Sequence, residues 1–126
     1  MPVDIQYQTN PTGVVLVYSG DITGNDIINV NDEIAGCQDC VYQLSDFTAV
    51  AHLKISVKEM HRIAIQDCSI PPHYKLMKSA LVGNMTRYAM LTDLYYLFLE
   101  VWVGKQCKYK TKSFDNVEQA RQWIGI

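Results

Sequence analysis

The sequence is poor in charge, and its two signs nearly cancel. Charged residues make up 19% of the 126 residues, with 11 Lys and Arg against 13 Asp and Glu, which gives a net charge of −2. A protein that binds nucleic acid through its phosphates needs a clear excess of basic residues. The balance therefore argues against a basic nucleic-acid-binding protein, and we expect no nucleic-acid partner.

Long apolar runs are also missing. The residues Met1–Tyr7 contain neither a basic run nor a long apolar run, so no secretory signal is expected. The most apolar stretch, Tyr88–Val103, is short for a bilayer span and is interrupted by Asp93 and Glu100. We therefore expect a cytoplasmic protein without a membrane span, in which the cysteines are thiols. The four cysteines are Cys37, Cys40, Cys68 and Cys107.

Motifs of known enzyme chemistry are absent from the sequence. It has no G-x-S-x-G, no P-loop and no G-x-G-x-x-G. The C-x-x-C of Cys37 and Cys40 follows a predicted helix instead of opening one, so no helix N-terminus activates its thiols. A zinc site would need two more ligands, and no second C-x-x-C is present. We expect a non-catalytic protein without cofactor or metal; an unrecognised enzyme would need a buried titratable pair, such as Asp46 with His52.

The sequence does contain regularly alternating strand and helix signals. The predicted strands are Val3–Thr9, Gly13–Ser19, Cys40–Phe47, Ser79–Gly83 and Gln106–Phe114, and the predicted helices begin near Thr23, Ser56, Met85 and Asp115. Helices separate the last four strands, so these strands are expected to be parallel, whereas a short turn makes the first strand antiparallel to the second. We predict an α/β fold for residues 1–126, as one domain. It has an open, mostly parallel five-stranded sheet and the element order β-β-α-β-α-β-α-β-α.

The predicted helix Met85–Val103 is apolar around a wide arc. At 100° per residue, its apolar side chains cover roughly 200° of the circumference, which is more than one sheet buries. A second helix or a second subunit must cover the remainder. The residues predicted to form that interface, or to line an apolar cavity, are Tyr88, Tyr95, Leu97, Phe98 and Trp102.

Small and polar residues follow the predicted parallel strands at their carboxyl ends. Open parallel sheets bind ligands at that edge. The candidate ligand-binding residues there are Asp21, Asp46, Thr48 and Asn84. The alternative is that these residues only form turns and helix caps.

Four stretches of the sequence carry a resemblance to a known family. They are GVVLVYSGDITGND (Gly13–Asp26), YQLSDFTAV (Tyr42–Val50), SALVGN (Ser79–Asn84) and KSFDNVEQARQWI (Lys112–Ile124). With the element order, they make the chain resemble the SpoIIAA-like branch of the STAS/SEC14-type fold over nearly its whole length. STAS domains include the anti-sigma-factor antagonists, and SEC14 relatives hold lipid-like ligands.

The resemblance implies a regulatory or binding role. Antagonists of this fold carry Asp-Ser-Ser-Gly at the start of their second helix, where a serine is phosphorylated. The matching region here, Phe47–Ser56, lacks that motif, and Ser56 occupies the equivalent helix start. Ser56 is therefore a candidate phosphate acceptor, or simply an N-cap. We expect a non-catalytic, homodimeric protein-interaction module; the alternative is a domain that binds a small hydrophobic, lipid-like molecule.

Overall fold

The computed structural model describes residues 2–37, 39–68, 75–84, 86–102 and 109–126. Its elements are β1 (Val3–Gln8), β2 (Gly13–Thr23), α1 (Gly24–Ile34), β3 (Tyr42–Lys54), α2 (Val57–Cys68), β4 (Lys78–Val82), α3 (Ala89–Trp102), β5 (Lys110–Phe114) and α4 (Val117–Ile124). The α/β class and the order of elements confirm the prediction.

The strands form one five-stranded sheet in the order β1-β2-β3-β4-β5. β1 is antiparallel to β2, with Val3 opposite Tyr18, and the other pairs are parallel. The spatial order therefore follows the chain order, and each crossover helix joins two neighbouring strands.

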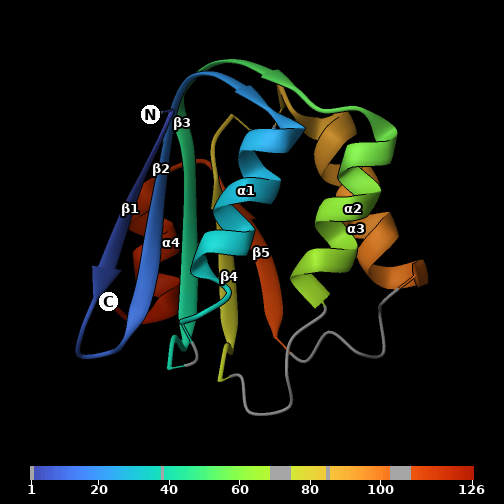
Figure 1. Ribbon diagram of the computed structural model, residues 1–126. Helices are drawn as coiled ribbons and strands as arrows, with labels where there is room; N and C mark the ends of the chain where they lie inside the picture. The colour runs from blue at the N-terminus through green and yellow to red at the C-terminus, as the bar shows by residue number, and fades with distance from the viewer. Residues whose placement is uncertain (1, 38, 69–74, 85, 103–108) are drawn as a thin grey trace.

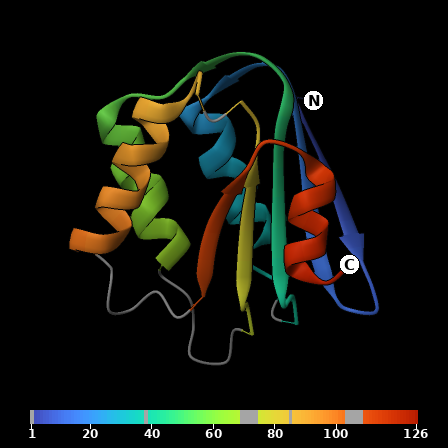
Figure 2. The same ribbon diagram turned by 180° about the vertical axis from the view of Figure 1, so that it is seen from behind.

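The helices divide unequally between the two faces of the sheet. α1, α2 and α3 share one hydrophobic core with the first two strands, in which Leu16 and Tyr18 are fully buried. In Figure 1, α1 lies over the sheet, and α2 and α3 stand side by side next to its β5 edge. α4 packs on the opposite face, seen in Figure 2, around Leu44 and Phe114. The larger core thus lies on the side of α1, α2 and α3.

Alternation along β3 and β4 gives these two faces different chemistry. Leu44 and Val82 point toward α4 and belong to its apolar cluster. The neighbouring positions face the other way, because successive side chains of a strand point to opposite faces. These positions hold Gln43, Ser45 and Ser79, so the face under α2 and α3 has a polar strip.

Two reciprocal capping boxes begin α1 and α2. The Thr23 hydroxyl accepts from the backbone N–H of Asp26 at 3.3 Å, and the Asp26 carboxylate accepts from the Thr23 N–H at 2.9 Å. Ser56 and Glu59 repeat the arrangement at 3.1 and 2.9 Å. Each box satisfies two N–H groups that a helix start leaves free, so the predicted helix starts are confirmed.

Two strands are longer than the sequence predicted. β2 continues to Thr23 instead of ending at Ser19, and β3 continues to Lys54 instead of ending at Phe47. Their pairing resumes after register shifts, one of them directly after Gly20, whose φ of 72° lies in the left-handed region. This paired extension arches over the top of α1 in Figure 1.

The predicted helix Met85–Val103 begins later than expected. α3 starts at Ala89, because Asn84 instead organises a turn: its side-chain oxygen accepts from the N–H of Arg87 at 3.0 Å. Met85 and Val103 lie outside the described residues, as do residues 106–108 of the predicted last strand.

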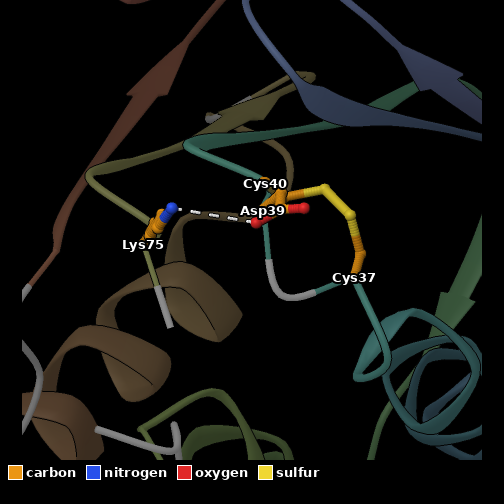
Figure 3. Close-up of a disulfide and its surroundings, with 4 residues drawn as sticks. All are labelled: Cys37, Asp39, Cys40 and Lys75. Atoms are coloured by element: carbon orange, nitrogen blue, oxygen red, sulfur yellow. Dashed lines mark ion pairs between the residues drawn. A yellow bond between two sulfur atoms is a disulfide. The ribbon is translucent and has the colours of Figure 1, made fainter. Parts of the chain in front are cut away.

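The prediction that all four cysteines are thiols is wrong for two of them. Cys37 and Cys40 form a disulfide with a Cα–Cα distance of 5.7 Å (Figure 3). Cys37 and Cys40 are three positions apart in the link between α1 and β3 and lie within bonding range, a local geometry that the compartment argument did not consider. Asp39, next to Cys40, pairs with Lys75 at 3.8 Å. The side chains of Cys68 and Cys107 are outside the described part of the chain.

Candidate functional site

A cavity of about 90 Å³ lies between the sheet and helices α1, α2 and α3. Its floor comes from the polar strip of β3 and β4 together with Tyr18 of β2. Its walls come from all three helices, with Asn31 on α1, Asp67 on α2 and Tyr95 on α3. The parts of the chain that form it are far apart in the sequence, so the site exists only in the folded protein.

The cavity is polar at one end and apolar at the other. Gln43 and Ser79 lie near the beginnings of their strands, and Asn31 and Asp67 lie near the ends of their helices. In a β-α-β unit the end of the helix lies at the level of the beginning of the next strand, so these polar groups share one end. The lining of the other end is mostly apolar and includes Phe47, Leu53, Ile55, Met60 and Leu91.

The carboxylate of Asp67 is the centre of the polar end. The Tyr95 hydroxyl donates a hydrogen bond to Asp67 Oδ2, and Asn31 Nδ2 donates one to Asp67 Oδ1 at 2.9 Å. The backbone carbonyl of Asp67 accepts from the hydroxyl of Tyr109 at 2.9 Å. Gln66 supports the position of Asn31, whose Nδ2 also lies 3.1 Å from Gln66 Oε1. The acid is thus held by groups from α1, from α3 and from the segment before β5.

Burial raises the pKa of Asp67 to about 7. The hydrogen bond from Tyr95 acts in the other direction and lowers this pKa, but its effect is smaller than that of burial. Burial also raises the pKa of Tyr95 well above its usual range, and the negative charge of Asp67 raises it further. The Tyr95 hydroxyl therefore keeps its proton and remains a donor. The site offers a carboxyl group that changes its charge near neutral pH.

Tyr88 places a second polar group in the wall of the cavity. Its hydroxyl oxygen is buried and has no hydrogen-bond partner among the described residues. A buried hydroxyl without a partner is costly, so such groups usually meet a water molecule or a ligand. This hydroxyl is therefore an available contact for a bound molecule.

None of the four residues predicted at the carboxyl ends of the strands lines this cavity. Asp46 lies between Ser45 and Phe47, which both line it, so strand alternation turns the Asp46 side chain to the α4 face. Its carboxylate accepts from the N–H and hydroxyl of Thr48 at 2.9 and 2.6 Å.

The other two predicted edge residues also make local contacts. Asp21 pairs with the exposed His52 at 2.9 Å, across the extension of β2 and β3. Asn84 organises the turn before α3. The structure therefore spreads the four residues over separate contacts. Whether they bind a ligand stays a prediction.

The five residues predicted on the long apolar helix fall in different environments. Tyr88 and Tyr95 line the cavity. Phe98 is half-buried, with its ring 5.1 Å from that of His61, and Leu97 is 51% exposed. The side chain of Trp102 lies outside the described residues. The predicted set therefore includes both cavity wall and outer surface.

Sequence reasoning missed the polar residues of the cavity. Asn31 shares a helix face with the apolar Ile27 and Ile34, which indicated its burial but not a site. Along β3, the polar Gln43 and Ser45 alternate with Tyr42 and Leu44. That period-two pattern was the signal for a polar surface beneath the helices.

The described residues form neither a metal-ligating cluster nor a membrane-spanning helix. No group of three or more His, Cys, Asp or Glu side chains in that part of the chain lies close enough together to hold a metal ion. None of the described helices has the length and apolarity to cross a bilayer.

Comparison with known proteins identifies the fold. No family model matches the chain, and no curated protein matches its sequence. Among solved structures, the chain is similar to an uncharacterised protein of the DUF3478 family with a SpoIIAA-like fold from Shewanella loihica PV-4. The two share 14% sequence identity, with a TM-score of 0.56, over 97% of this chain and 91% of that one. The chain therefore has a SpoIIAA-like fold, as the resemblance of its sequence predicted.

Proposed function

We propose that the chain is a non-catalytic, STAS-type regulatory module that acts by binding, and that it forms a homodimer through α3. The observation that carries this proposal is the outer face of α3. Met90 is 85% exposed and Leu97 is 51% exposed, and Leu94 between them is half-buried. Spacings of four and three residues place these side chains on one face of the helix.

An exposed apolar stripe on a helix favours contact with a partner over contact with water. A second copy fits best, because a stripe that runs along one straight helix can pack against itself across a two-fold axis. Such a dimer would also cover the part of the apolar arc that α2 and the sheet leave open.

Sedimentation velocity tests the dimer on the full chain. The wild type should sediment as a dimer at micromolar concentration, and Leu97→Glu should convert it to a monomer. Met77→Lys is the matched control, because Met77 is 66% exposed but lies on the approach to β4. A wild-type monomer, or equal loss of the dimer in the control, would contradict the proposal.

The cavity favours a second function, the binding of a small, mostly apolar molecule. The buried hydroxyl of Tyr88 and the carboxylate of Asp67 provide two polar contacts in a cavity whose other end is mostly apolar. An engineered apolar cavity of about 150 Å³ binds benzene, so about 90 Å³ suits a molecule with only a few non-hydrogen atoms. A longer, lipid-like chain would have to extend out of the cavity.

Pressurised xenon tests whether the cavity accepts an apolar guest. Its binding should shift the amide NMR signals of lining residues such as Met60 and Leu91, and native mass spectrometry should separately reveal a molecule that purifies with the protein. Unchanged signals at the lining residues would exclude this second function for the cavity.

The remaining sequence predictions concern modification and location. We propose Ser56 as a phosphate acceptor: it is exposed at the start of α2, where free N–H groups and the helix dipole favour an anion. Intact-mass measurement of protein from its native host tests it, and unmodified protein in every growth condition would contradict it.

We propose a cytoplasmic location as well. Fractionation of cells of the native host tests this location directly. The protein should be recovered with cytosolic marker enzymes. Recovery with the contents of an oxidising compartment, where disulfides such as that of Cys37 and Cys40 persist, would contradict it.

A further inference from the structure

We propose, resting on the second function above, that the cavity selects small alcohols and amines over acids, because the Asp67 carboxylate accepts a hydrogen bond from the ligand. The occupant would be a short alkyl chain with one hydroxyl or amino group. Its polar group would lie at the Asp67 end, and its chain would extend toward Phe47 and Leu91.

The first argument is the remaining hydrogen-bonding capacity of Asp67. A carboxylate has about four acceptor positions on its two oxygens. Among the described residues, Tyr95 occupies one on Oδ2 and Asn31 occupies one on Oδ1. The carboxylate can therefore accept a further donor on either oxygen. Because Asp67 lines the cavity, that donor can belong to a ligand.

The second argument is the absence of a counter-charge for an acid. No Lys, Arg or His is among the described residues that line the cavity, whereas an Asp is. Arg87, next to Tyr88, is outside the lining: it donates to the carbonyl of Ala51 and lies over the Tyr88 ring, 5.3 Å from its centroid. An anionic head group would lose its water without gaining a cation and would be repelled by Asp67.

The third argument is the neutral polar surface around the acid. Ser45 and Ser79 are buried at 3% and 5% exposure on the floor. Hydroxyl groups can donate to a ligand oxygen as well as accept from it, so they suit an alcohol, which both donates and accepts. Apart from the hydroxyls of Tyr88 and Thr92, the apolar end offers mainly van der Waals contact to an alkyl chain.

The experiment compares three ligands of equal length on the full chain by NMR titration at about pH 8, where Asp67 is ionised: n-butanol, n-butylamine and butyrate. Xenon is the apolar reference, because its binding depends on the space and not on a polar group. We expect n-butanol and n-butylamine to bind at least about tenfold more tightly than butyrate, since an unpaired buried charge is costly. Butyrate bound as tightly as n-butanol would overturn the proposal.

A variant identifies the residue responsible. In Asp67→Asn, n-butylamine should lose its advantage over butyrate, while xenon still binds and shows that the cavity remains folded. Asp93→Asn is the matched control, because it removes the same charge from an exposed position on α3 and should leave the wild-type order unchanged. If Asp67→Asn still binds n-butylamine more tightly than butyrate, Asp67 is not the residue that selects the ligand and the proposal is overturned.

The two proposals fail in different ways. If neither xenon nor n-butanol binds, the cavity is closed to ligands and the small-molecule function itself is wrong. If xenon binds and the three head groups do not differ, the cavity accepts apolar guests but Asp67 does not select them.

Discussion

Tyr95 of α3 donates a hydrogen bond to the carboxylate of Asp67 on α2, beside the cavity. The same carboxylate accepts from Asn31 of α1, so one acid joins all three helices on this side of the sheet. The arrangement makes both the stability of the helical layer and the charge of the cavity depend on Asp67.

The stability of the protein should fall as the pH rises through the titration of Asp67. Its pKa of about 7 in the folded state exceeds the ordinary value of 3.8, so the folded state binds the proton more tightly. The protonated Asp67 makes its full contribution to the free energy of unfolding below the ordinary pKa of 3.8. That contribution is lost as the pH rises to about 7. Urea unfolding should show a wild-type loss of about 2–3 kcal/mol between about pH 5 and about pH 8. In Asp67→Asn this loss should disappear, and an equal loss in both proteins would contradict the assignment.

Replacing Tyr95 by Phe should raise the pKa of Asp67 further, because the hydrogen bond from Tyr95 stabilises the ionised acid. NMR titration of the Asp67 carboxyl carbon measures the change. Tyr96→Phe is the matched control: it removes a hydroxyl that bonds to Ser113 at 2.7 Å and should leave the Asp67 titration unchanged. Parallel shifts in both variants would indicate a general loss of packing instead.

Gly13→Ala should destabilise the protein, whereas Gly36→Ala should not. A Cβ atom at Gly13 would lie 2.2 Å from the ring of Tyr42, which is itself buried, so the ring or the strand would have to move. A cost of about 1–3 kcal/mol is typical of such overpacking. A Cβ atom at Gly36 would meet nothing within 4 Å. Thermal unfolding of the two variants compares them directly, and similar melting temperatures would contradict the close approach of β2 and β3.

Ser56→Ala should lower stability by about 1 kcal/mol, because it removes the acceptor that caps α2. Ser56→Asp should retain most of the wild-type stability, since Asp is also a good N-cap and its charge suits the helix N-terminus. Urea unfolding at one pH separates the two variants. Equal stability of all three proteins would show that the capping box contributes nothing measurable.

The order of elements was predictable because each signal is local. Ser56 with Glu59 marks a helix start within four residues, and the alternation in Val3–Thr9 marks a strand without reference to the rest of the chain. The paired extension of β2 and β3 was not predictable in this way. It depends on register shifts around Gly20, which arise only when two distant segments meet.

The cavity depends on contacts between residues far apart in the sequence. Asn31 and Asp67 are separated by 36 positions. The helical pattern places Asn31 on the face of Ile27 and Ile34, but it does not show that Asn31 meets Asp67. The prediction of a site at the strand ends placed Asp46 by its position along the strand and did not consider which face it occupies. The disulfide of Cys37 and Cys40 is different, because it depends on local geometry. The two cysteines were predicted to be thiols from the expected compartment, without considering that their close spacing allows a bond.

The unequal division of helices between the two faces bears on how the chain folds during synthesis. α4 covers the apolar cluster around Leu44, Ala80 and Val82, and it follows all five strands in the sequence. A nascent chain would therefore expose this apolar strip until residues 117–124 have left the ribosome. Chaperones that bind exposed apolar strands would find their target there, and arrival of the final helix would end that vulnerable period.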